Sequence, residues 1–177
     1  MDVFDYERWL TSMNELATRM TAGFQEKFGF PPYENGVERA EGEPEGLEAL
    51  PAPLAEFYRH VAEVSLMNVF VGYAVWPAQH TISGLQGVQP IRLEGPGTVD
   101  VVTFGSDGGG TLFALGLPAG APVYLLPPSG VDRSGVYDNS DSRAKVVATT
   151  LPEFLGKLHD VLEDVVHDRF DPSRHFA

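Results

Sequence analysis

Residues 104–115 read Phe-Gly-Ser-Asp-Gly-Gly-Gly-Thr-Leu-Phe-Ala-Leu, and this segment carries the clearest signal of the fold. Val101 and Val102 precede it, and Leu117 continues the apolar pattern beyond it. Glycines supply the positive φ angles of a tight turn, and apolar flanks are typical of strands. The segment therefore predicts a β-hairpin. A phosphate-binding loop is disfavoured, because such a loop leads from its glycines into a helix and often carries a lysine.

The chain after the hairpin predicts two more strands and a closing helix. Residues 122–126 and 145–149 are the expected strands, separated by a polar, turn-rich loop over 127–142. Apolar residues then recur at helical spacing from Leu151 to Val165. Thr150 and Glu153 have the spacing of a capping box, in which a hydroxyl and a carboxylate satisfy free amides. We expect this helix to pack on the sheet.

An apolar stripe marks the N-terminal region as a helix. Its residues recur at spacings of three and four: Trp9, Met13, Leu16, Met20, Phe24 and Phe28. Stripes of this period mostly pack on the core of their own domain. If the stripe were exposed, it would instead be the seam of a homodimer or the groove for a partner. The sequence leaves both interpretations open.

Between this helix and the hairpin the pattern is weaker. Residues 29–50 are rich in proline, glycine and glutamate, which predicts a solvent-facing acidic connector. A short helix is expected over 53–63 and a strand over 69–76. Residues 78–98 allow at most one short strand. The connector has two interpretations, a mobile linker or part of an acidic surface for a basic partner.

Together these elements predict a single α+β domain over residues 1–177. We expect an antiparallel or mixed sheet of about five or six strands, packed by helices at the N-terminus, in the middle and at the C-terminus. The parts are the N-terminal helix (1–28), the acidic connector (29–50), the core (51–167) and a tail (168–177). His175 falls in that tail, where fraying is common.

Composition narrows the function classes. The chain has no cysteine, which excludes disulfides, thiolate zinc sites and cysteine nucleophiles. Twelve basic residues against twenty-five acidic ones give a formal charge of −13, so nucleic acid is disfavoured as a direct ligand. The charge could steer a basic protein partner, or it could serve solubility alone. No apolar run reaches the roughly 18 residues of a membrane span, and no basic leader is visible, which predicts a cytoplasmic protein.

The sequence offers no clear catalytic or metal site. His159, Glu163 and His167 could share one helical face, but the two histidines lie about 12 Å apart along the axis, too far for one zinc ion. A Gly-x-Ser-x-Gly turn for a serine nucleophile is absent. We therefore expect no enzymatic activity, no metal and no cofactor.

Several short motifs in a fixed order resemble the SMI1/KNR4 family, also called the SUKH superfamily. They are the Phe104-Gly105 pair with its glycine turn, the Pro122-Val-Tyr124 strand, the final helix, the Leu50-Pro-Ala-Pro helix opening, and Gly72-Tyr73 before Trp76-Pro77. The resemblance covers roughly residues 47–160 and implies the same α+β class.

The resemblance also implies a function. Many bacterial members look like immunity proteins, which bind a cognate toxin, often a nuclease, and block its active site. A basic toxin would be met by carboxylates on loops beside the sheet. The candidate contact residues are Asp107 in the glycine turn, Asp132, Asp138 and Asp141 in the polar loop, and Glu38 and Glu41 in the connector. Each could equally be an ordinary turn aspartate or a solvated glutamate. A regulatory or scaffold protein of the same family, or a small-molecule binder, are the alternatives.

Overall fold

The computed structural model describes residues 4–171 and 176, and over this range it is an α+β structure. Its helices are α1 (Tyr6–Thr21), α2 (Phe24–Phe28), α3 (Ala52–His60), α4 (Ala78–Gly84) and α5 (Leu151–Val166), with a short 3-10 helix at Leu47–Ala49. Its strands are β1 (Asn35–Arg39), β2 (Val61–Leu66), β3 (Tyr73–Val75), β4 (Arg92–Glu94), β5 (Val99–Asp107), β6 (Leu112–Gly116), β7 (Val123–Leu126), β8 (Val136–Asp138) and β9 (Lys145–Ala148).

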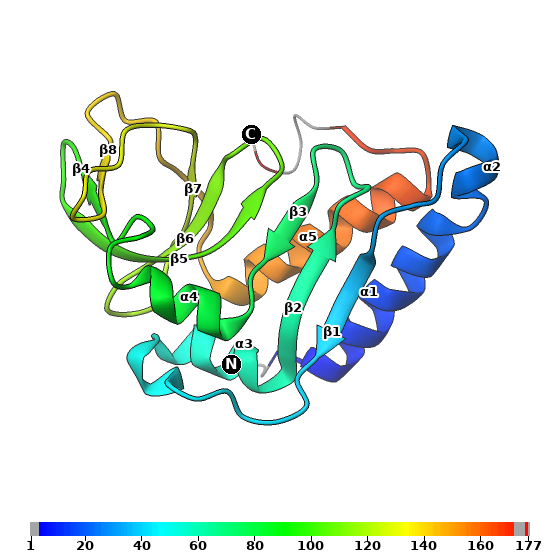
Figure 1. Cartoon of the computed structure of the whole chain (residues 1–177), viewed down its shortest axis with the longest axis horizontal. Helices are drawn as coiled ribbons and strands as arrows, with labels where there is room; N and C mark the ends of the chain where they lie inside the picture. Colours follow the sequence, from blue (N-terminus) through cyan, green and yellow to red (C-terminus); the bar gives the residue numbers. More distant parts are fainter. Residues whose placement is uncertain (1–3, 172–175, 177) are drawn as a thin grey trace.

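The strands form one sheet in the order β1-β2-β3-β5-β6-β7-β9, with every neighbouring pair antiparallel. The sheet has nine strands rather than the expected five or six, because three strands, β1, β2 and β8, leave little trace in the sequence. β4 pairs antiparallel with the start of β5 and parallel with β8. Figure 1 shows α1 and α5 behind the sheet, with the β4 and β8 strands at its left end.

Side chains on the two faces of the sheet belong to different apolar clusters. Successive residues of a strand point to opposite faces. Val102 and Phe104 accordingly lie in the large core with Phe154 of α5, whereas Val101 lies in a small second cluster. That second cluster also contains Leu93, Ala114, Leu126 and Tyr137. We call β4, β8 and the loops around them the flap, because they cover this face of the sheet.

The N-terminal stripe is buried within the chain, but it is not one helix. Trp9, Met13 and Leu16 are buried, and the indole Nε1 of Trp9 donates to the Leu155 carbonyl at 3.0 Å. The predicted helix through residue 28 is wrong, because Gly23 takes a left-handed φ of 70° and separates α1 from α2. A homodimer through α1 stays a prediction, and it would have to use residues other than these three.

The acidic connector is more ordered than predicted. β1 lies inside it and pairs with β2, and Val37 of β1 is buried. The prediction of a purely solvent-facing segment over 29–50 is therefore wrong. β1 has a single buried side chain, so it has no apolar alternation that would reveal a strand.

The middle of the chain needs three further corrections. α3 ends at His60 and β2 begins at Val61, so the helix expected to reach residue 63 is shorter. The strand expected over 69–76 is only Tyr73–Val75, because residues 67–72 form the turn between β2 and β3. Residues 78–98 contain α4, which was not expected, and the one short strand, β4.

The segments around the glycine turn match their predictions. β5 and β6 form the expected hairpin, β7 and β9 are the two later strands, and α5 begins at Leu151. Thr150 Oγ1 accepts from the Glu153 amide at 3.2 Å, but the Glu153 carboxylate returns to the Thr149 amide at 2.8 Å, one residue before the expected partner. In the tail, His175 lies outside the described residues, whereas Phe176 packs against the core.

Candidate binding surface

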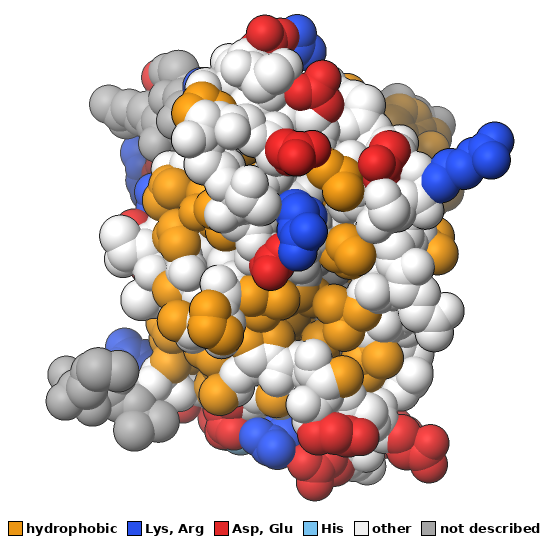
Figure 2. All heavy atoms as spheres, turned by 90° about the vertical axis from the view of Figure 1, so that its left-hand side faces the viewer, with side chains coloured by type: hydrophobic (Ala, Val, Ile, Leu, Met, Phe, Trp, Pro, Cys, Tyr) orange, Lys and Arg blue, Asp and Glu red, His pale blue; other side chains and the backbone are white. Residues whose placement is uncertain are grey.

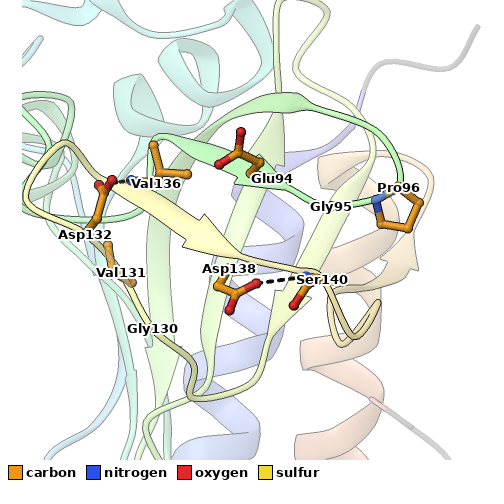
Figure 3. A pocket seen from close by; sticks show the side chains of 9 residues that line it. All are labelled: Glu94, Gly95, Pro96, Gly130, Val131, Asp132, Val136, Asp138 and Ser140. Carbon is orange, nitrogen blue, oxygen red and sulfur yellow. Dashed lines mark hydrogen bonds between the residues drawn. The ribbon is translucent and has the colours of Figure 1, made fainter.

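The flap carries an open hollow of about 740 Å³ on the side of the sheet away from α1 and α5. Figure 3 shows the residues around it: Glu94, Gly95, Pro96, Gly130, Val131, Asp132, Val136, Asp138 and Ser140. The only charged side chains in this lining are three carboxylates, those of Glu94, Asp132 and Asp138. The hollow is therefore acidic, with valine and proline side chains between its charges.

Asp132 is held in place by the turn that leads into β8. Its Oδ1 accepts from the amide and the hydroxyl of Ser134, both at 2.8 Å, and from the amide of Val136 at 3.0 Å. The Val136 hydrogen bond, followed by those from Ser134, lowers the pKa of the Asp132 carboxyl. The carboxylate is thus ionised and fixed in direction, although it remains exposed to solvent.

Asp138 is fixed in a similar way at the other end of β8. Its Oδ1 accepts from the Ser140 amide at 3.0 Å, and the hydrogen bonds from Ser140 lower the pKa of the Asp138 carboxyl. The residue after Asp138 connects β8 with β4, because the Asn139 amide donates a hydrogen bond to the Glu94 carbonyl at 2.8 Å. Glu94 itself was missed in the sequence, because it lies on β4 in the segment without a clear pattern.

The floor of the flap is anchored in the fold. Tyr137, the central residue of β8, is buried, and its hydroxyl donates a hydrogen bond to the Pro127 carbonyl at 2.6 Å. Val131, in contrast, is 41% exposed at the rim of the hollow. An exposed apolar side chain beside fixed carboxylates suits lysine or arginine, whose alkyl stem packs on apolar surface while the cation bonds to the acid.

The other predicted contact residues do not join this hollow. Asp107 accepts from the amides of Gly109 at 2.9 Å and Thr111 at 2.8 Å in the β5–β6 turn. Asp141 pairs with Arg143 at 2.9 Å, three residues beyond Asp138. Glu38 lies on β1 opposite Glu63, and Glu41 is exposed in the loop that follows β1. Only Asp132 and Asp138 of the six candidates therefore share one site.

Acidic side chains are separated by apolar surface on the flap side of the molecule. Figure 2 looks onto this side and shows carboxylates near its upper and lower ends, with hydrophobic side chains gathered between them. Two exposed apolar side chains of the flap are Val88, in the loop between α4 and β4, at 77%, and Val131, in the loop before β8, at 41%. Arg92 lies on β4 of this side and pairs with Asp100 at 2.7 Å.

The contact between α1 and α5 has some features of a catalytic triad, but its geometry differs from one. Ser12 Oγ lies 2.8 Å from His159 Nε2, and His159 Nδ1 lies 3.8 Å from Asp160 Oδ1. The second distance is too long for a hydrogen bond. Ser12 is also in the middle of α1, where backbone amides bond within the helix and cannot form an oxyanion hole.

One group in the described part of the chain has donor atoms close enough to suggest a cation site. The ligand atoms of His159, Asp160 and Glu163 lie within 4.8 Å of one another. His167, expected on the same face, is instead engaged at the end of α5. Its Nδ1 lies 2.8 Å from the Glu163 carbonyl, and its Nε2 lies 3.4 Å from Arg19.

None of the helices in the described residues is both long enough and apolar enough to cross a membrane. Comparison of the chain with protein-family models, with curated proteins and with solved structures found no match.

Proposed function

We propose that this chain is a protein-binding domain of the SMI1/KNR4 type, which neutralises a cognate basic toxin in the manner of a bacterial immunity protein. The observation that carries the proposal is the lining of the flap hollow, where every charged side chain is a carboxylate and apolar side chains lie between the charges. The motif order over residues 47–160 supports the family, and the formal charge of −13 supports a basic partner.

Neutralisation would work by occlusion. A nuclease presents lysine and arginine where it binds the phosphates of its substrate, and carboxylates can take the place of those phosphates. The fixed directions of Asp132 and Asp138 reduce the entropy lost when the complex forms. The negative field of the whole molecule would speed encounter at low salt by about ten- to a thousandfold. In this proposal the protein acts in the cytoplasm, needs no cofactor and has no catalytic activity.

The first test is a pull-down with the chain as bait against the products of its neighbouring genes, at low and at high salt. Any captured protein is then expressed alone and together with this chain. We expect one basic protein that is toxic alone and harmless together with the chain. Capture without rescue would favour a regulatory or scaffold protein instead.

Charge-neutral variants then test the hollow. Glu94→Gln, Asp132→Asn and Asp138→Asn together remove three charges but keep the oxygen acceptors of the turns. A matched set on the connector, Glu41→Gln, Glu45→Gln and Glu48→Gln, removes the same charge elsewhere. We expect the first set to weaken binding about tenfold or more, mainly by slowing association, and the second set to have a much smaller effect. Equal effects would show that only net charge matters.

A further inference from the structure

Exposed large apolar side chains are concentrated at one end of the molecule, away from the flap. Six of the nine such residues in the described part of the chain lie in two short segments. Phe28, Phe30 and Tyr33, which are 50%, 47% and 68% exposed, follow each other around the end of α2. Met67, Phe70 and Val71, which are 46%, 58% and 40% exposed, belong to the β2–β3 turn. We call these six residues the apolar end.

Hydrogen bonds hold the two segments next to each other. Asn35, two residues after Tyr33, donates from Nδ2 to Asn68 Oδ1 at 2.7 Å and accepts from the Asn68 amide at 3.0 Å. Phe24, Phe28 and Phe30 form an aromatic group with ring centroids 4.5 to 6.4 Å apart. In Figure 1, α2 and the β2–β3 turn both lie in the upper right part of the molecule.

The conformation of Phe70 favours a functional role for this end. Phe70 has a φ of 51°, a left-handed value that is unfavourable for a bulky side chain. Its ring nevertheless stays 58% exposed and contacts only one other described ring, that of Phe170 at 5.4 Å. Strained residues persist where the surrounding structure holds them, and they cluster at functional sites. Because the Phe70 ring is mostly exposed, a contribution to the core does not explain an aromatic residue at this position.

The charges around the apolar end are mostly negative. Among the described residues, the two segments of the apolar end, residues 168–171 and the β5–β6 turn carry five carboxylates and two cations: Glu26, Glu34, Asp107, Asp168 and Asp171 against Lys27 and Arg169. Lys27 lies over the Phe28 ring at 5.4 Å, and Arg169 pairs with Asp164 at 3.0 Å. Asp107 belongs to this rim because the Gly108 amide donates to the Gly72 carbonyl at 3.1 Å. A second copy of this acidic chain, or an anionic membrane, would be repelled.

We propose that the apolar end is a second docking surface, for a protein segment that presents aromatic or aliphatic side chains flanked by lysine or arginine. Protein interfaces combine an apolar centre, rich in Tyr, Phe and Met, with a polar rim, and this end has both. The proposal of this docking surface does not rest on toxin neutralisation, because a regulatory or scaffold protein could bind a partner through the same residues. It lies apart from the flap hollow, so the two surfaces can be tested separately.

The probe is a phage-displayed library of random peptides selected on the full-length chain, and the best peptide is then synthesised. We expect enriched peptides in which aromatic or aliphatic residues adjoin lysine or arginine. Binding of the synthetic peptide, measured by fluorescence anisotropy, should weaken at least tenfold in Tyr33→Ser with Phe70→Ser. Tyr33→Ser alone, at a 68% exposed position, serves as the variant least able to disturb folding, and it should weaken binding at least threefold.

Two controls separate the possible occupants. The flap set Glu94→Gln, Asp132→Asn and Asp138→Asn should leave peptide binding unchanged. Analytical ultracentrifugation of the wild-type chain and of Phe70→Ser is the second control. We expect no dimer of the wild-type chain that is lost in Phe70→Ser. The proposal is overturned if no peptide is enriched, if binding is insensitive to Tyr33→Ser and Phe70→Ser, or if such a dimer is found, since a second copy would then be the occupant.

Discussion

Asn14 closes part of the open edge of the sheet with its side chain. From α1, its Nδ2 donates to the Val37 carbonyl at 2.9 Å, and its Oδ1 accepts from the Val37 amide at 2.9 Å. The side-chain amide thus pairs with β1 as a neighbouring strand would. Gly36 permits this approach, because a Cβ there would lie only 2.8 Å from Asn14 Oδ1. Exposed strand edges promote aggregation, and this contact protects the centre of β1.

Replacing Asn14 by alanine should lower the free energy of unfolding by about 1 kcal/mol. Two hydrogen bonds are lost, each with a net contribution of about 0.5 to 1.5 kcal/mol, while alanine recovers part of the loss through its higher helix propensity. Urea unfolding measures the change. The exposed neighbour Glu15→Ala is the control, and it should shift stability by less than about 0.5 kcal/mol. Equal shifts for both variants would contradict the role of Asn14.

Asp132 should make the stability of the flap depend on pH. Hydrogen bonds, first of all from the Val136 amide, keep its folded pKa below the usual value. The charge therefore stabilises the fold above the unfolded pKa of about 3.9, and this contribution is lost as pH falls through the folded pKa. We expect Asp132→Asn, which keeps a neutral acceptor, to lose less stability than wild type between about pH 4 and pH 2.

A second variant separates the charge of Asp132 from its role as an acceptor. Asp132→Ala removes the acceptor at every pH, so its urea midpoint should already be lower at pH 7. Urea unfolding midpoints of the wild type, Asp132→Asn and Asp132→Ala, measured at several pH values, separate the effect of the charge from that of the acceptor. If Asp132→Asn follows the wild-type pH dependence, other carboxylates account for it.

At the scale of single residues, only part of the candidate site could be predicted. Asp132 and Asp138 were found because aspartates in a turn-rich loop beside a sheet are exposed by default. Glu94 could not be found, because β4 has only three residues, too few for its alternation to be recognised in the sequence. Both Asp107 and Asp132 are turn aspartates, but Asp107 lies in the β5–β6 turn next to Gly72, whereas Asp132 lines the flap hollow, and nothing local in the sequence reveals this difference.

At the scale of elements, strong local signals predicted structure correctly. The hairpin of β5 and β6 has apolar flanks around a glycine turn, and α5 has both a cap and a long apolar face. Elements that depend on distant partners were missed. β2 follows α3 without a turn residue between them, β1 is short and mostly polar, and β8 has only three residues. Their strand conformation comes from pairing across the sheet, which single-sequence propensity does not contain.

Phe176 connects the end of the chain to the core and should contribute measurably to stability. Its ring lies 5.3 Å from Tyr73, 5.8 Å from Phe113 and 5.8 Å from Phe154. Because Phe176 is only partly buried, Phe176→Ala should cost about 1 to 2 kcal/mol, roughly half of a typical core Phe→Ala. Tyr33→Ala, at a 68% exposed position, is the matched control and should change stability by less than about 0.5 kcal/mol. Urea unfolding of both variants tests this, and equal losses would contradict it.

At the scale of the whole molecule, the carboxylates are spread over several surfaces. The flap holds one group, and residues 43–56 bring four more carboxylates, those of Glu43, Glu45, Glu48 and Glu56, around a second hollow with Arg59. Figure 2 shows acidic side chains at both the upper and the lower end of the flap side. The total charge could be counted from the sequence, but this division could not, because it depends on how the connector packs against α3.

This distribution predicts that sodium chloride stabilises the fold. At pH 7 a formal charge of −13 makes the folded chain repel itself more than the expanded one. Raising the salt concentration from about 10 mM to 150 mM shortens the screening length from about 30 Å to 8 Å, so the melting temperature should rise by a few degrees. The connector set Glu41→Gln, Glu45→Gln and Glu48→Gln should start from a higher melting temperature and gain less from salt. Chloride is preferred to sulfate, which stabilises proteins by exclusion from their surface. A melting temperature that falls with salt would mean that ion pairs such as Arg59 with Glu43, at 2.9 Å, outweigh the repulsion.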